Sequence, residues 1–261
     1  MHTVAELAEF LDAFAPPALA EEWDNVGLLV GRFEQSVERV MTCLTITPES
    51  AAEAVAAQAN LIVSHHPLPF RPLKRLTGET NEGRLLLDLI AAGIAVYSPH
   101  TAFDSAAEGI NQRLAAGLHL TDVLPIVPAT EPWQGAGRHG RLEQPLSLRE
   151  LARRVKQLLA IENVQAVGAL DEPIASVAVA CGSAGEFLEP AQAADCQCLV
   201  TGEVRFHTCL DAEARGMSLV LAGHFASERF AVEQLVGVLA ARFPGLQVWA
   251  SRQEKDPLHW L

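Results

Sequence analysis

The stretch that most constrains the fold is LIVSHHPLP, at residues 61–69. Its first four residues form a short apolar run that favours β-structure, which predicts a buried strand over 61–64. This strand leads directly into His65 and His66, which precede Pro67. Successive side chains of a strand point to opposite faces, so two adjacent histidines rarely bind one ion. At a strand end before a proline turn the pair can splay and reach two ions, and imidazole is the commonest metal ligand.

Composition limits the classes of protein to consider. The chain has 261 residues, of which 49% are hydrophobic, so it has enough apolar sequence for one large domain or two lobes. Its formal net charge of -13, without a basic block, argues against general binding to nucleic acid or to an anionic membrane. No apolar run reaches the length of a membrane span, and the N-terminus lacks a secretory signal. The five cysteines, with Cys196 and Cys198 too close for a zinc ribbon, are interpreted as buried free thiols of a cytoplasmic protein.

Strands and helices alternate in the first part of the chain. Strands are predicted at 26–30, 40–46, 61–64 and 94–98. Helices are predicted after Thr3, which opens a capping box with Glu6, after Thr47, and from Asn81 as a cap. This alternation favours an α/β sheet with parallel segments, in which ligands bind beyond the carboxyl ends of the strands. The histidine pair and His100 both fall at such ends.

Proline and glycine are concentrated in residues 124–145. This segment is interpreted as the passage between two lobes, 1–125 and 126–261, with a short strand near 140–142. In the second lobe, strands are predicted at 164–167, 174–181, 198–201, 219–222 and 246–250. Helices are expected at 147–159, 186–194 and 227–240. The glycine-rich turn at 182–185 is either a tight turn or a phosphate-binding turn.

Three smaller features have two interpretations each. Trp23, Asp24 and Asn25 form either a hydrogen-bonded turn or the lining of a pocket. The basic stretch 70–77 either attracts an anion or is a solvated loop. Asp104 alone would be a helix N-cap, but its place opposite the histidine pair favours a metal ligand.

Histidines and carboxylates recur just after the predicted strands. Five of the nine histidines lie there, together with three carboxylates: His65, His66, His100, His207, His224, Asp104, Glu203 and Glu228. Mixed imidazole and carboxylate ligands suit Zn, Mn, Fe or Co better than Ca or a metal that prefers thiolates. His224 and Glu228 are four residues apart, and therefore share one face of a helix that begins near His224.

Five stretches together resemble a known family. EEWDNVGLLVG, SHHPLPFRPLKRLT, HTAFDSAAEGIN, TGEVRFHT and GHFASE occur in this order between residues 21 and 228. They are similar to the Ngg-interacting-factor-three-like family of dinuclear metal proteins, also called GTP cyclohydrolase type 2 homologs. The chain has HTAFD where the family often has HTNLD, and TGEVRFHT where many members carry paired histidines.

The resemblance implies two similar, interlinked α/β lobes with mixed sheets and a dinuclear metal site between them. His66 and Asp104 would hold one divalent ion, His65 and His224 the other, and Glu228 would bridge both. His100, Thr101, Glu203 and His207 would line the pocket. A ring-shaped homohexamer is also implied.

A metal-dependent hydrolase is the first functional hypothesis. A metal-bound hydroxide would attack the substrate, and His100 or Glu203 would assist proton transfer as catalytic residues. The substrate stays open between a nucleotide, a phosphoester and a cyclic amide. The alternatives are a non-catalytic metal carrier, insertion factor or storage protein, and an interaction scaffold.

Overall fold

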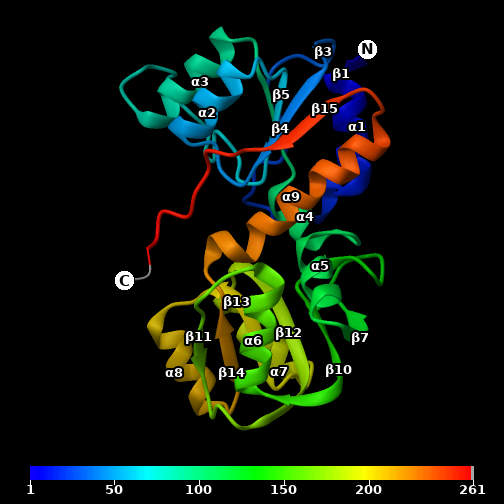
Figure 1. The fold of residues 1–261 in the computed structure, drawn as a ribbon, viewed down its shortest axis with the longest axis vertical. Coiled ribbons are helices and arrows are strands. Elements are labelled where there is room, and N and C mark those ends of the chain that lie inside the picture. Colours follow the sequence, from blue (N-terminus) through cyan, green and yellow to red (C-terminus); the bar gives the residue numbers. More distant parts are fainter. Residues whose placement is uncertain (260–261) are drawn as a thin grey trace. The chain divides into compact units, whose positions relative to one another are not determined.

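The computed structural model describes residues 1–259 and divides the chain into two compact units (Figure 1). Unit 1 comprises Met1–Phe103 and Ala231–Pro257. Unit 2 comprises Asp104–Phe230 and, at the C-terminal end of the described chain, residues 258 and 259. These limits differ from the expected lobes 1–125 and 126–261, because the last strand of the chain joins the sheet of unit 1. The expected mixed α/β class is confirmed in both units.

Unit 1 is built on a five-stranded sheet with the order β15-β4-β5-β6-β2. In this order the strands are Gln247–Ala250, Arg39–Cys43, Leu61–Ser64, Ala95–Ser98 and Gly27–Val30. The first four are parallel, and β2 is antiparallel to β6. β1 (His2–Thr3) and β3 (Ser36–Val37) form a separate antiparallel pair. The strand predicted at 61–64 is confirmed as the central strand β5.

Helices cover both faces of this sheet (Figure 1). α1 (Val4–Phe14) and the second half of α9 (His224–Arg242) pack on one face, and α2 (Pro48–Ala56) and α3 (Asn81–Ala91) pack on the other. Neighbouring residues of β5 serve different cores, since Val63 packs under α1 and Ile62 under α2 and α3. The predicted caps Thr3 and Thr47 are confirmed, whereas α3 is capped by Thr80 and not by Asn81. A short 3-10 turn, η1 (Pro17–Leu19), follows α1.

Unit 2 is built on a six-stranded sheet with the order β11-β14-β13-β12-β10-β7. In this order the strands are Gln165–Val167, Ser218–Leu221, Cys198–Glu203, Pro173–Ser183, Arg138–Ser147 and Leu120–Leu124. The three central strands β12, β13 and β14 are parallel, and the remaining pairs are antiparallel. β8 (Val127–Pro128) and β9 (Gly135–Ala136) form a small separate pair.

The interpretation of 124–145 as a passage between lobes is wrong, because this segment supplies most of β10 inside unit 2. The strand accommodates Pro145 at an irregularity, since its register against β12 shifts between Arg141 and Leu146. Proline is tolerated at such a bulge because no ladder hydrogen bond is required there.

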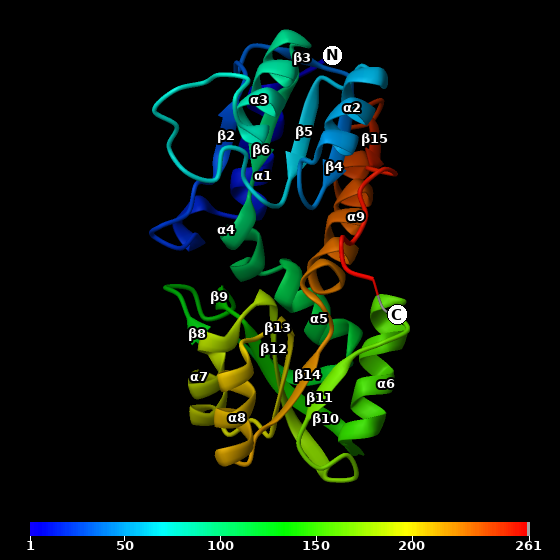
Figure 2. The same ribbon diagram turned by 90° about the vertical axis from the view of Figure 1, so that its left-hand side faces the viewer.

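Helices also cover both faces of the second sheet (Figure 2). α7 (Leu188–Ala193) and α8 (Phe206–Ala214) lie on one face, and α5 (Ile110–Gly117) and α6 (Leu148–Leu159) lie on the other. A 3-10 turn, η2 (Gly185–Phe187), leads into α7, and the short helix α4 (His100–Ser105) follows β6. Because both sheets are covered on two sides, their central strands are almost continuously apolar. Polar functional side chains therefore appear at the strand ends.

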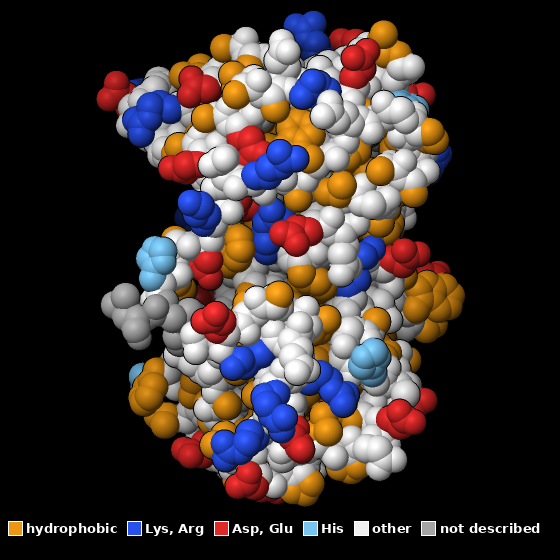
Figure 3. All heavy atoms as spheres, in the orientation of Figure 1, with side chains coloured by type: hydrophobic (Ala, Val, Ile, Leu, Met, Phe, Trp, Pro, Cys, Tyr) orange, Lys and Arg blue, Asp and Glu red, His pale blue; other side chains and the backbone are white. Residues whose placement is uncertain are grey.

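The surface carries both signs of charge. Figure 3 shows acidic and basic side chains interspersed over one face of the molecule. All five cysteines are thiols outside disulfide bonds; four of them are buried, as predicted, whereas Cys209 is only partly buried. Within residues 1–259, no helix is long and apolar enough to cross a membrane.

Candidate metal centre

The histidine pair of unit 1 is held by its backbone at the end of β5. The N–H of His65 donates to the carbonyl of Cys43 at the end of β4, over 3.0 Å. The Ser98 hydroxyl donates to the carbonyl of His65 over 2.6 Å, and the Ser64 hydroxyl donates to that of His66 over 2.9 Å. These bonds fix the two peptide groups, so the rings of the pair are positioned by the sheet itself.

Three imidazoles gather at this strand end. His100 begins α4 directly after β6, and its ring centroid lies 5.1 Å from that of His65 and 5.5 Å from that of His66. Each of the three residues offers a ring nitrogen, and these atoms all lie within 4.8 Å of one another. A cluster of imidazole nitrogens at such separations has the chemistry of a transition-metal site.

Two of the three rings are oriented by a hydrogen bond between Nδ1 and a side-chain oxygen. The Nδ1 atom of His66 lies 2.7 Å from the hydroxyl oxygen of Thr45, and the Nδ1 atom of His100 lies 2.7 Å from Oδ1 of Asp24. Histidines that bind metals almost always use one ring nitrogen for such a bond, which fixes the tautomer and presents the other nitrogen to the ion. The arrangement therefore presents Nε2 of both rings.

Asp24 is the buried anchor of His100. Its carboxylate also accepts bonds from the hydroxyl and N–H of Thr101 and from the N–H of Asn25. Burial alone would raise the pKa of Asp24, but the bonds from His100 and Thr101 outweigh it and lower that pKa to about 2. His100 has φ +26°, a backbone conformation that is costly outside glycine and is concentrated at functional sites. The predicted hydrogen-bonded turn is confirmed, and the bond between Asp24 and His100 connects this turn to the histidine cluster.

Within unit 2, a histidine and a glutamate lie in the first turns of α9. The helix begins at His224, three residues before the expected start at 227, and Nε2 of His224 lies 3.2 Å from Oε2 of Glu228. The Nδ1 atom of His224 bonds to Oε1 of Glu203 over 3.0 Å. The hydrogen bond that the His224 ring donates to the Glu228 carboxylate outweighs partial burial and, together with the bond to the Glu203 carboxylate, raises the pKa of His224 to about 9. The buried carboxylate thus favours a cation at this position, either a proton or a metal ion.

Asp104 is oriented by two buried side chains of unit 2. The Cys181 thiol at the end of β12 donates to Oδ1 of Asp104 over 3.2 Å. The Asn111 amide donates to the carbonyl of Asp104 over 3.1 Å and accepts from the N–H of Cys181 over 2.8 Å. Burial, followed by the carboxylates of Asp104 and Glu228, raises the pKa of the thiol, so it remains a donor. Nothing in the sequence distinguished Cys181 from the other apolar thiols of the core.

Gly182 makes room for the carboxylate of Glu228. It has φ +65°, and a Cβ atom added here would lie 2.3 Å from Oε1 of Glu228 and 3.5 Å from Nε2 of His224. Its N–H donates to the Ser227 hydroxyl over 3.0 Å. A phosphate at this turn would meet a buried carboxylate, so the tight-turn interpretation is favoured over phosphate binding. The backbone of Gly182 therefore lies close to the paired side chains of His224 and Glu228, and this arrangement suits a small cation.

The other expected site residues have different surroundings. The carboxylate of Glu203 is bonded to His224, which indicates a positioning role for it. His207 lies on α8, where its ring contacts that of Phe206. Thr45, which orients His66, was not foreseen because a lone threonine after a strand carries no metal signal.

Two α/β units whose parallel strand ends carry imidazoles and carboxylates define a candidate metal-binding protein. The chain belongs to the Duf34/NIF3 (NGG1p interacting factor 3) family, whose model matches residues 2–257. It is 34% identical over 260 residues to a GTP cyclohydrolase 1 type 2 homolog of Clostridium acetobutylicum, with 97% of each chain covered. It is 35% identical over 271 residues to the Protein NIF3 homolog of Schizosaccharomyces pombe, with 97% of this chain and 96% of that one covered.

Solved structures agree with the fold. A Bacillus cereus protein related to NIF3 superposes with a TM-score of 0.90 at 22% identity, covering 100% of this chain and 99% of that chain. Reduced HcgD from Methanocaldococcus jannaschii superposes with a TM-score of 0.84 at 25% identity, covering 95% and 97%. The predicted family and fold are therefore confirmed.

Proposed function

We propose that this protein binds two divalent metal ions per subunit and acts as a metal-dependent hydrolase. His66 and Asp104 would hold one ion, His65 and His224 the other, and Glu228 would bridge both. In support, His65 and His66 directly follow the parallel strand β5 of unit 1, and His224 follows the parallel strand β14 of unit 2. Zn, Mn, Fe and Co all suit such mixed ligands.

The observation that carries the proposal is the orientation of the histidines. His66, His100 and His224 each have Nδ1 fixed by an oxygen, at 2.7, 2.7 and 3.0 Å respectively. Histidines that bind metal ions commonly have one ring nitrogen fixed by an oxygen in this way, which leaves the other nitrogen for the ion.

The chemistry assigns different tasks to the residues. When bound, the ions would act as Lewis acids that polarise the substrate and lower the pKa of water. His100 would hold or move a proton at Nε2, because Asp24 occupies its Nδ1 and fixes the ring. Glu203 would position His224 and not transfer protons itself. The substrate class includes nucleotides, phosphoesters and cyclic amides. Because relatives are named as homologs of GTP cyclohydrolase 1 type 2, GTP is the first compound to assay.

Metal analysis of purified variants tests the proposal. We expect two ions per subunit in the wild-type protein, none in Glu228→Ala, and selective weakening of one ion in His65→Ala or His66→Ala. Glu213→Ala on α8 is the control and should retain both ions. Full metal content in Glu228→Ala would contradict the bridging role.

Activity assays separate the hydrolase from its alternatives. The metal-loaded protein should hydrolyse a member of a panel of GTP, cyclic nucleotides, phosphoesters and cyclic amides, and His100→Ala should lower turnover more than metal content. Absence of turnover together with transfer of the ions to a metal-free client would instead identify a metal carrier, insertion or storage protein. Partner binding that persists after metal loss would identify a scaffold.

Assembly and location are proposals of the same kind. The family resemblance supports a homohexamer, which light scattering after size-exclusion chromatography would test. The five free thiols support a cytoplasmic location. The net charge of -13 supports the absence of general nucleic-acid binding, which a salt-dependent DNA retention assay would test.

A further inference from the structure

Two exposed aromatic side chains stand beside the histidine cluster of unit 1. Trp23 is 61% exposed and Phe70 is 44% exposed, and their ring centroids are 5.9 Å apart. Each ring meets His100 edge-on, at 5.9 Å for Trp23 and 6.1 Å for Phe70. A chain of rings thus leads from the proposed metal ligands to the surface. Neighbouring exposed rings form an apolar surface, and contiguous apolar surface often marks a ligand-binding site.

The segments that carry the two rings are held by directional bonds. The turn that bears Trp23 is fixed on both sides, because the N–H of Glu21 donates to the Thr101 hydroxyl over 3.0 Å and Asp24 accepts four bonds. The Asn25 amide then donates to the carbonyl of Pro69 over 2.8 Å, which ties the turn to the segment that bears Phe70.

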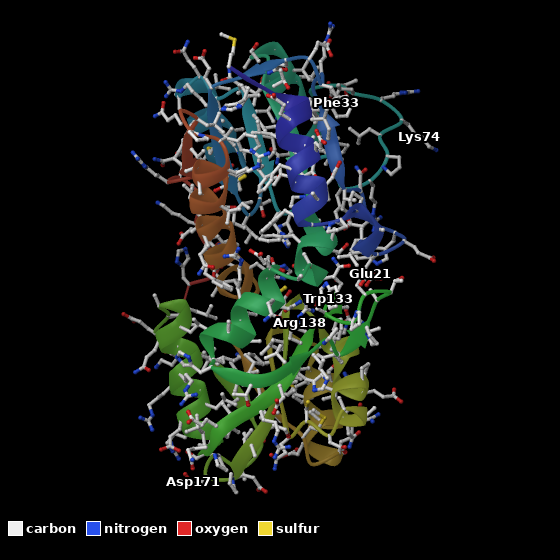
Figure 4. All side chains as sticks on the ribbon, turned by 90° about the vertical axis from the view of Figure 1, so that its right-hand side faces the viewer. Glu21, Phe33, Lys74, Trp133, Arg138 and Asp171 are labelled. Carbon is white, nitrogen blue, oxygen red and sulfur yellow. The ribbon has the colours of Figure 1, made fainter. Side chains whose placement is uncertain are left out.

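The segment that bears Phe70 is also held by a hydrogen bond of its own. The N–H of Phe70 donates to Oε1 of Glu82 on α3 over 3.3 Å. Beyond it the loop turns outward, and Lys74 projects away from the body of unit 1 (Figure 4). Both aromatic side chains remain partly exposed to solvent. Rigid aromatic rings lose little conformational entropy on binding, which suits them to act as an anchor for a ligand.

We propose that Trp23 and Phe70 form a stacking platform that binds a planar heteroaromatic ring of the substrate. This inference deepens the proposed function and rests on it for the reaction, because the ring would lie next to His100 and the proposed metal ligands. Stacking on aromatic side chains tolerates different bases, since every base has a π-face. The platform would thus select substrates that carry a planar ring. His100 and the proposed metal ligands would determine which bond of the substrate is broken.

Calorimetric titration of the full-length protein with adenosine, guanosine and ribose tests the platform. The two nucleosides should bind and ribose, which lacks a ring system, should not. Trp23→Ala and Phe70→Ala should each weaken nucleoside binding roughly 10-fold or more, the usual consequence of removing one stacking partner. Trp23→Phe keeps an aromatic face and should lose much less.

Matched controls come from unit 2. Trp133 is 59% exposed and Phe206 is 71% exposed, so Trp133→Ala and Phe206→Ala remove comparable exposed rings and should leave nucleoside binding unchanged. Metal content of Trp23→Ala should equal that of the wild-type protein. Equal effects of Trp23→Ala and Trp133→Ala would overturn the inference, as would equal binding of ribose.

Two further outcomes separate this inference from the proposed function. Nucleoside binding that survives chelation of the metals, in a protein without hydrolytic activity, would support the platform and contradict the hydrolase. Loss of the oligomeric state in Trp23→Ala with unchanged nucleoside binding would overturn the platform, because the rings would then belong to a subunit contact.

Discussion

The thiol of Cys181 donates a hydrogen bond to Oδ1 of Asp104 over 3.2 Å. The two residues are far apart in sequence and come from the end of β12 and from α4. Asn111 closes the arrangement by bonding to the backbone of both. The carboxylate proposed to hold a metal ion is therefore oriented by a side chain that carries no recognisable metal motif.

Replacement of Cys181 tests this bond. Cys181→Ala should lower the free energy of unfolding of metal-free protein by about 1 kcal/mol, because the partly buried carboxylate of Asp104 loses one hydrogen-bond donor. Cys181→Ser keeps a hydroxyl donor and should recover much of the loss. Urea denaturation in the presence of a chelator measures both values. Equal destabilisation by the two variants would show that thiol packing matters and the hydrogen bond does not.

Replacement of Gly182 by alanine should prevent binding of the proposed metal ions. Gly182→Ala places Cβ against Oε1 of Glu228, at 2.3 Å, and also strains a backbone with φ +65°. Gly216 has φ +69° but nothing within 4 Å of an added Cβ, so Gly216→Ala carries the strain without the clash. We expect metal analysis to show loss in Gly182→Ala and retention in Gly216→Ala. Equal metal content in both variants would contradict the proposed role of Glu228.

Arg138 is a buried structural cation of unit 2 (Figure 4). Its guanidinium donates to the carbonyls of Gly135, Gly137 and Ala106 and to the side chain of Gln112, at 2.6–2.9 Å. Arg138→Met should cost about 3 kcal/mol or more, because several buried acceptors lose their donor at once. Urea denaturation measures the loss.

Lysine and an exposed arginine provide the comparison for Arg138. Arg138→Lys should recover only part of the stability, because an ammonium group cannot reproduce the planar fork of donors. Arg149 forms an exposed pair with Asp171 at 3.5 Å, and Arg149→Met should cost less than about 1 kcal/mol. A similar loss for Arg149→Met and Arg138→Met would refute the structural role of Arg138.

Protonation of Glu53 at low pH should destabilise the C-terminal segment of unit 1 to which this carboxylate is hydrogen-bonded. Partial burial would raise the pKa of Glu53, but bonds from the Ser251 hydroxyl, the N–H groups of Arg252 and Gln253, and the Trp249 indole lower it below its usual 4.5. A carboxyl with a lowered pKa in the folded protein stabilises it above pH 4.5, and this contribution disappears as the pH falls through the lower folded value.

Hydrogen exchange can locate this effect. Amide exchange in residues 249–253 should accelerate below about pH 4 relative to the centre of the sheet, after correction for the intrinsic pH dependence of exchange. Glu53→Gln should make that segment exchange faster at neutral pH and remove most of the additional acid response. An unchanged acid response in the variant would assign it to another group.

Local sequence was sufficient where a residue and its neighbours decide the structure. The apolar run before His65 predicted β5, and the caps Thr3 and Thr47 predicted the starts of α1 and α2, because these patterns depend on interactions within a few residues. The passage expected at 124–145 failed because proline and glycine indicate irregular backbone, and only the pairing partner β12 shows that the irregularity is a bulge inside a strand.

For the candidate site, sequence determined which side chains could bind a metal, since imidazole and carboxylate chemistry belongs to the residues themselves. It could not determine what orients them. The hydrogen bonds between Thr45 and His66, between Asp24 and His100, and between Cys181 and Asp104 join residues that are distant along the chain. The tertiary structure decided these contacts, because they depend on which strand ends lie side by side, and sheet order follows from the packing of the whole unit and not from any local pattern.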